Sequence, residues 1–133
     1  MKAYTPVNEP VLAKEIFDRL RQATAGNPEV LAELCRDYVF EARNALAQMQ
    51  QAMDRADAGR LRERAHYLKG SSMMIGAREL SACCATLEQM GRDAQLAAAG
   101  PELARAMTAL KTVEAELSQE FGPAILPEEG TAA

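Results

Sequence analysis

The sequence has no tryptophan, and aromatic residues make up only 5% of its 133 residues. Residues branched at Cβ are few, and no stretch alternates valine, isoleucine, threonine or tyrosine with polar residues in the way that a half-buried strand does. Alanine, leucine and methionine dominate the apolar residues, and all three favour helices. The composition therefore predicts an all-α protein, with a length that suits one domain and its own core.

The chain also lacks an excess of positive charge and lacks long apolar runs. Its formal net charge is -4, whereas a surface that binds nucleic acid is normally basic. No apolar run approaches the roughly 20 residues that cross a membrane, and the N-terminal stretch M-K-A-Y-T-P-V-N-E-P has no apolar core of a signal peptide. We therefore expect a cytoplasmic protein that binds neither nucleic acid nor membrane.

Cysteine and histidine are scarce. The cysteines are Cys35, Cys83 and Cys84, and an odd number with one adjacent pair is a poor disulfide framework without the spacing of a zinc site. The single histidine, His66, cannot form a metal cluster with other histidines. We expect the cysteines to be small core residues in a reducing compartment, and we expect no metal or cofactor.

Helix signals divide the chain into five predicted helices. The first is short, with Asn8 as its cap and Gly26 as its end. The second begins at Asn27, which can cap a helix that has Pro28 in its first position, and it runs to about Met53. The third begins after a capping aspartate at position 57 and ends before a glycine at position 76, and the fourth carries residues 80–94.

The Gly100-Pro101 pair is expected to break the chain before a fifth helix that carries Leu103 to Leu117. Four amphipathic helices with short connections predict an antiparallel four-helix bundle, and the additional short N-terminal helix would cover one end of it. We therefore expect three segments: a flexible N-terminus at residues 1–9, the helical bundle at residues 10–121 and a flexible C-terminal tail at residues 122–133.

His66 points away from the predicted core. At about 100° per residue, the recurring small and apolar residues of the third helix fall within about 40° of Leu61 and define its buried stripe. They are Leu61, Ala65, Leu68, Ser72 and Ile75. By the same count His66 lies at about 140°. The residues around it are Arg62, Lys69, Gly70 and Met73.

The residues on this exposed face suit a particular kind of chemistry. A neutral imidazole is a nucleophile that can take up a phosphoryl group and release it again. Lys69 is within reach of a phosphoryl group on His66, and cations assist phosphoryl transfer. Gly70 costs the helix about 1 kcal/mol relative to alanine, which is explained if it clears the approach to the ring. The ordinary explanation stays open, because a lone exposed histidine and a nearby lysine can simply be surface residues.

The run from Ala65 to Leu80, A-H-Y-L-K-G-S-S-M-M-I-G-A-R-E-L, closely resembles the motif of histidine-containing phosphotransfer (HPt) domains. That motif has a histidine, then Leu-Lys-Gly, a serine, a glycine turn and an apolar helix. The segment from Cys83 to Arg92, C-C-A-T-L-E-Q-M-G-R, is similar to the next helix of the family. The resemblance covers about residues 10 to 118 and is most specific around the histidine.

The resemblance implies a role for each site residue. His66 would be the phosphoacceptor through Nε2, Lys69 would help to hold the phosphoryl group, and Gly70 would keep the site open. Glu88 and Arg92 match positions where the family often places polar groups near the histidine, although their spacing also allows them to pair with each other.

Partner binding is expected at Arg62, Met73, Glu88 and Arg92. A departure from the family is the pair of methionines that begins at Met73, which is bulkier than the small residues common there, so partner choice can differ.

The resemblance implies a phosphorelay intermediate without kinase activity of its own. It would accept a phosphoryl group from a receiver-domain aspartate and pass it to a response regulator, as a monomer. Its partners would be receiver domains of response regulators and a hybrid sensor kinase, with Mg²⁺ supplied by the receiver. Two alternatives stay open: a phosphoacceptor domain charged directly by a separate kinase catalytic domain, and a bundle that binds a partner without transfer. The sequence has no glycine-rich nucleotide-binding box of its own.

Overall fold

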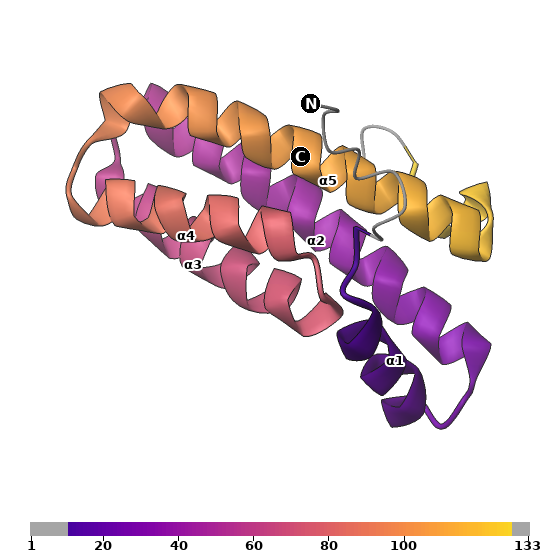
Figure 1. Ribbon diagram of the computed structural model, residues 1–133. Helices are drawn as coiled ribbons and strands as arrows, with labels where there is room; N and C mark the ends of the chain where they lie inside the picture. Colours follow the sequence, from indigo (N-terminus) through magenta and orange to yellow (C-terminus); the bar gives the residue numbers. More distant parts are fainter. Residues whose placement is uncertain (1–10, 129–133) are drawn as a thin grey trace, which may run out of the picture.

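Helices dominate the part of the chain that the computed structural model describes, residues 11–128 (Figure 1). The helices are α1 (Lys14–Ala23), α2 (Pro28–Asp54), α3 (Ala58–Ile75), α4 (Arg78–Arg92), the short 3₁₀ helix η2 (Leu96–Ala98), α5 (Ala99–Phe121) and the short 3₁₀ helix η3 (Pro123–Ile125). No strand forms within residues 11–128, apart from one isolated β-bridge between Leu12 and Ala77. The all-α fold predicted from the composition is confirmed.

A four-helix bundle is formed by α2, α3, α4 and α5, each of which packs against two of the others. Figure 1 shows α5 lying along α2, with the shorter α3 and α4 beside them. Short connections make helices that follow one another run antiparallel. The additional helix α1 contacts α2 and α3 and lies beyond the ends of α3 and α4, beside the first half of α2 (Figure 1). Among the residues described, no helix is both long and apolar enough to span a membrane.

The ends of α2 and α3 follow the signals in the sequence. The Asn27 side chain accepts two backbone N–H bonds from the first turn of α2, and Pro28 occupies the first position, where a missing N–H costs nothing. The Asp57 side chain accepts from the backbone N–H of Arg60 at 3.0 Å at the start of α3. Gly76 ends α3 with φ of 90°, a left-handed conformation that favours glycine.

The core consists mainly of leucine and alanine, together with the three cysteines. All three cysteines are buried and free, as expected. Burial raises the pKa of Cys35 and Cys83 to about 11 and that of Cys84 to about 12, so the thiols remain protonated at neutral pH. One polar pair crosses the core, a 2.7 Å hydrogen bond between the hydroxyls of Tyr38 and the fully buried Ser72.

The structure differs from the prediction at the start of the first helix. α1 begins at Lys14, and residues 11–13 ahead of it are not helical, with Ala13 in an extended conformation. The backbone N–H of Ala13 donates to the carbonyl of Gly76 at 2.8 Å, and Leu12 is buried beside it. This contact holds the segment against the turn between α3 and α4, which no local pattern reveals. The predicted cap, Asn8, lies outside the described residues.

The expected break at Gly100 and Pro101 is wrong. Both residues lie in the first turn of α5, which begins at Ala99 and continues directly from η2. Proline is tolerated there because the first N–H groups of a helix have no partner within the helix.

Residues 122–128 also differ from the expected flexible tail, because they pack onto the bundle. Ile125 is only 2% exposed, and the guanidinium of Arg36 donates to the carbonyl of Ala124 at 2.6 Å. Arg43 donates to the carbonyl of Pro127 at 3.1 Å. A single apolar residue has no period to detect, so the sequence pattern missed this docking. The rest of the expected tail lies outside the described residues.

Candidate functional site

His66 lies on the outer side of α3. The five residues predicted for the buried stripe of this helix are all buried, and none of them is more than 2% exposed. His66 projects from another side of the helix, and 70% of its side chain is exposed. The helical count therefore placed the imidazole correctly, within reach of another protein.

Glu88 of α4 holds one side of the imidazole ring. Its Oε2 lies 2.9 Å from His66 Nδ1, and only 9% of the Glu88 side chain is exposed. The hydrogen bond from Lys69, with a smaller contribution from His66, holds the pKa of the Glu88 carboxyl below its usual range despite the opposing effect of burial. An ionised carboxylate can only accept, so Nδ1 carries the proton in this contact. In the neutral ring this leaves the lone pair on Nε2.

Lys69 and Arg92 complete an ionic network around Glu88. Lys69 Nζ lies 2.7 Å from Glu88 Oε1, and an Arg92 guanidinium nitrogen lies 3.5 Å from Oε2. Three side chains that carry N–H groups thus surround one nearly buried carboxylate. The network ties α3 to α4 at the level of His66 and keeps a cation one helical turn from the ring.

Two glycines near the site have opposite surroundings. A Cβ added to Gly70 would meet nothing within 4 Å, so packing does not require glycine there. A Cβ added to Gly91 of α4 would lie 2.8 Å from the backbone nitrogen of Arg62 and 2.9 Å from the carbonyl oxygen of Ala58. Gly91 therefore lets α4 approach the backbone of α3. This requirement was not predicted from the sequence.

The residues expected to bind a partner separate into two groups. Met73 and Arg92 are exposed, with 58% of Met73 and 50% of the Arg92 side chain open to solvent. Arg62 is also exposed on α3, but within residues 11–128 it makes no hydrogen bond or ion pair with the network around Glu88. Glu88 is nearly buried and contacts His66, the residue near which the resemblance placed it.

A groove between α3 and α4 begins beside Lys69 and Met73, and we call it the basic groove. It has a volume of about 430 Å³, and Ser81, Ala82 and Ala85 form its α4 side. The charged side chains that line it are two cations, those of Lys69 and Arg78. This groove was not predicted from the sequence. The small residues on the outer side of α4 were the available signal, but only the packing of α4 against α3 turns them into a groove.

Comparisons with known proteins agree with the helical fold. The family model of the Hpt domain matches residues 33–120, which is well over half of the chain. The crystal structure of histidine-containing phosphotransfer protein B (HptB) from Pseudomonas aeruginosa PAO1 is similar, with a TM-score of 0.79 and 25% sequence identity. The match covers 85% of this chain and 96% of that chain. A search of curated proteins finds no match.

Proposed function

Because the chain belongs to the Hpt domain family and is a histidine phosphotransfer protein of phosphorelays, we propose that His66 is the residue that carries the phosphoryl group. The contrast between the two ring nitrogens supports this assignment. Nδ1 donates to the nearly buried Glu88, whereas the ring as a whole is 70% exposed. The lone pair on Nε2 is therefore available to an approaching partner.

The transfer step follows from this arrangement. Nε2 attacks the phosphorus of a phosphorylated aspartate on a receiver domain, and an N–P bond forms. The bond between phosphorus and the aspartate oxygen breaks, and that oxygen keeps the electron pair as a carboxylate. The imidazole retains its proton on Nδ1 and becomes cationic, and ionised Glu88 stabilises this charge from 2.9 Å. The reverse sequence delivers the phosphoryl group to the next receiver.

Lys69 and Gly70 assist this step in different ways. Lys69 is held by Glu88 at 2.7 Å, one turn from His66, and it can turn its ammonium towards the oxygens of a phosphoryl group on the ring. Gly70 leaves open the space that the receiver and the phosphoryl group need above the imidazole, because nothing lies within 4 Å of its would-be Cβ. Positioning and charge are the main contributions that a protein makes to phosphoryl transfer.

The receiver docks around His66. Met73 offers an exposed apolar contact, and Arg62 of α3 and Arg92 of α4 add positive charge near the ring. An aspartyl phosphate is anionic, so these cations and those of the basic groove favour its approach. The donor is the receiver of a hybrid sensor kinase, the acceptor is a response regulator, and this chain acts as a monomer without a phosphoryl source of its own.

Labelling from a phosphorylated receiver tests the assignment. We expect the protein to take up an acid-labile, base-stable phosphoryl group, His66→Gln to take up none, and Tyr67→Phe, the matched change at the next position, to be labelled like wild type. Because the chain has a single histidine, ¹H–¹⁵N spectra of the ring should show one imidazole with its proton on Nδ1. Labelling of His66→Gln would show that the phosphoryl group is carried elsewhere.

The same assay separates the alternative donors. The protein with ATP alone should remain unlabelled. Labelling by ATP and a kinase catalytic domain, with no receiver present, would favour a phosphoacceptor domain that is charged directly.

A further inference from the structure

Residues 122–128 follow α5 and fold back onto α2 and α5, and we call them the strap. Gly122 makes the turn with φ of 92° and ψ of 160°, a conformation that is essentially restricted to glycine. Arg43 of α2 donates both to Glu114 of α5 and to the carbonyl of Pro127. The strap therefore returns to the level of a residue that lies about two turns before the end of α5.

Two arginines of α2 hold the main chain of the strap. Arg36 donates to the carbonyl of Ala124 at 2.6 Å, and Arg43 donates to the carbonyl of Pro127 at 3.1 Å. Seven residues of helix span about 10.5 Å, and three residues of chain span at most about 10–11 Å, so the two spacings match. Because every residue has a carbonyl, these two contacts place little restriction on the side chains of the segment that they hold.

Arg43 is held in place by α5 as well as by the strap. Its Nε donates to Glu114 Oε2 at 2.9 Å, and only 17% of the Arg43 side chain and 14% of the Glu114 side chain are exposed. This ion pair joins α2 to α5 and does not involve the strap. The guanidinium therefore stays aimed at the position of the strap, as a prepared donor for a carbonyl oxygen.

One side chain anchors the strap. Within residues 122–128, Ile125 is the one buried residue, at 2% exposed, whereas Leu126 and Pro127 are half-buried. Burial of one such side chain favours the closed strap by roughly ten- to a hundredfold, and the ordering of the segment opposes it. A segment with so few contacts can open locally while the four helices remain packed.

We propose that the surface of α2 and α5 under the strap, which we call the strap site, binds an extended segment of another protein. The partner segment inserts one isoleucine-like side chain in place of Ile125 and offers carbonyls to Arg36 and Arg43. The strap is the intramolecular occupant of this site. An attached segment has an effective concentration of about millimolar order, so the closed strap excludes a free segment until it opens.

The strap site is separate from the surface around His66. Glu41 of α2 accepts from Tyr67 of α3, and Arg43 projects about 200° away from Glu41 around α2. The strap site therefore faces away from α3. Binding there adds a second protein contact to phosphotransfer, and it does not depend on the assignment of the phosphoacceptor.

Hydrogen exchange of the wild-type protein tests whether the strap opens by itself. The amides of Ile125 and Leu126 donate to carbonyls within the strap. We expect both to exchange at least tenfold faster than the amide of Leu117 in α5, with rates that low urea concentrations leave unchanged, because local opening exposes little surface. Exchange of all three amides at one rate, with one urea dependence, would show that the strap opens only when the bundle unfolds, and would overturn the proposal.

A peptide tests the site in the full chain. The probe is the blocked peptide G-P-A-I-L-P-E, the sequence of residues 122–128, and the reference peptide has serine in place of isoleucine. In the variant Ile125→Ser the probe should shift the amides of Arg36 and Arg43, and the reference should bind at least tenfold more weakly. Wild type and the matched variant Ala124→Ser, which changes an exposed side chain, should bind the probe at least tenfold more weakly than Ile125→Ser does.

Substitutions in the Ile125→Ser background supply the controls, with far-UV circular dichroism as the check on folding. Arg36→Ala should weaken binding of the probe threefold or more, because it removes a charge-assisted hydrogen bond. Arg55→Ala, the matched change of an exposed arginine at the end of α2, should leave binding unchanged. Ile125→Ser should accept a phosphoryl group from a receiver at the wild-type rate.

Four outcomes of these experiments would overturn the proposal. A folded Ile125→Ser variant that fails to bind the probe would show that the strap site does not accept a free segment. Equal affinity for the probe and the reference would remove the anchor. Slower phosphoryl transfer to Ile125→Ser would make the strap site part of the receiver surface. A wild-type dimer that the probe dissociates would identify the strap of a second copy of this chain as the occupant.

Discussion

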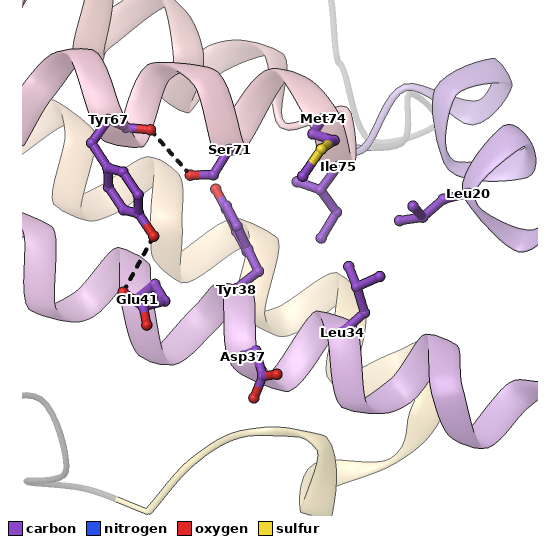
Figure 2. A pocket seen from close by; sticks show the side chains of 9 residues that line it. All are labelled: Leu20, Leu34, Asp37, Tyr38, Glu41, Tyr67, Ser71, Met74 and Ile75. Carbon is purple, nitrogen blue, oxygen red and sulfur yellow. Dashed lines mark hydrogen bonds between the residues drawn. The ribbon is translucent and has the colours of Figure 1, made fainter. Parts of the chain in front are cut away.

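Two hollows border α3: the basic groove, and a smaller hollow between α3 and α2 that we call the α2–α3 pocket, lined by residues that include Leu34, Tyr67 and Met74 (Figure 2). They differ in size and in charge. The basic groove has about 430 Å³ and meets Lys69 and Arg78, whereas the pocket has about 190 Å³ and meets Asp37 and Glu41. α3 supplies one wall of each hollow, so the helix alone does not decide their character. The neighbours do, since α4 adds small side chains on one side and α2 adds carboxylates on the other.

His66 and Tyr67 show the same contrast at single residues. Each has a glutamate partner, Glu88 at 2.9 Å for the imidazole and Glu41 at 3.3 Å for the phenol. Glu88 is nearly buried and is held by Lys69, whereas Glu41 is exposed. A buried, paired carboxylate fixes the orientation of its ring more firmly than an exposed one, which competes with water. The two neighbouring rings on α3 therefore differ in how firmly a carboxylate orients them.

Filling the space above His66 should have the largest effect on the rate of phosphoryl transfer. We expect Gly70→Gln to slow phosphoryl transfer by about a hundredfold, because the new side chain displaces the receiver from the ring. Thr108→Gln, a change of an exposed residue on α5, should transfer at the wild-type rate. Stopped-flow or gel-based transfer rates measure both variants, with circular dichroism as the check on folding. If Gly70→Gln loses helical signal, the glycine is structural instead.

Substitution of alanine for each of the two glycines should change the free energy of unfolding in opposite directions. Gly91→Ala forces a Cβ against the backbone of α3 and should lower the free energy of unfolding by about 1–3 kcal/mol. Gly70→Ala places its Cβ in open space and should raise that free energy by up to about 1 kcal/mol. Urea unfolding curves compare both variants with wild type. A shift in the same direction for both would contradict the difference in packing.

Removal of the carboxylate that holds the imidazole should have an intermediate effect on the rate of phosphorylation. Glu88→Ala should slow phosphorylation of His66 roughly tenfold, which corresponds to the loss of one charge-assisted hydrogen bond. Glu88→Gln keeps an acceptor for Nδ1 and should lose less. Glu41→Ala, the matched change beside Tyr67, should leave the rate unaltered. An equal loss in Glu88→Ala and Glu41→Ala would show that orientation of the ring by Glu88 does not govern the rate.

Changes of exposed charge should have the smallest effect, and they should act on receiver binding. Arg78→Glu should weaken binding of an acidic receiver by about two- to fivefold, mainly through slower association, and added salt should reduce the difference. Arg105→Glu, the same change of charge at an exposed residue of α5, should leave receiver binding within error of wild type, because α5 packs mainly against α2 and α4. Surface plasmon resonance at two salt concentrations makes the comparison. A larger effect for Arg105→Glu would place the receiver on α5.

Much of the fold was predictable because its signals are local. Asn27 and Asp57 cap their helices and Gly76 ends one, as interactions within a few residues dictate. The errors came where distant segments meet. Ile125 packs into the bundle and Ala13 bonds to the turn between α3 and α4, and neither contact has a counterpart in the sequence pattern.

The candidate site likewise combines features that one helix determines with features that depend on the packing of several helices. The spacing of residues on one helix determined that His66 faces outward, with Lys69 and Gly70 one turn away, because an α-helix fixes the direction of each side chain relative to its neighbours. Only the tertiary structure decided that Glu88, 22 residues further along the chain, bonds to Nδ1, that Gly91 admits α4, and that opposite charges border the two hollows beside α3. The packing of separate helices sets these features, and it depends on the distance and rotation between them, which no single helical repeat encodes.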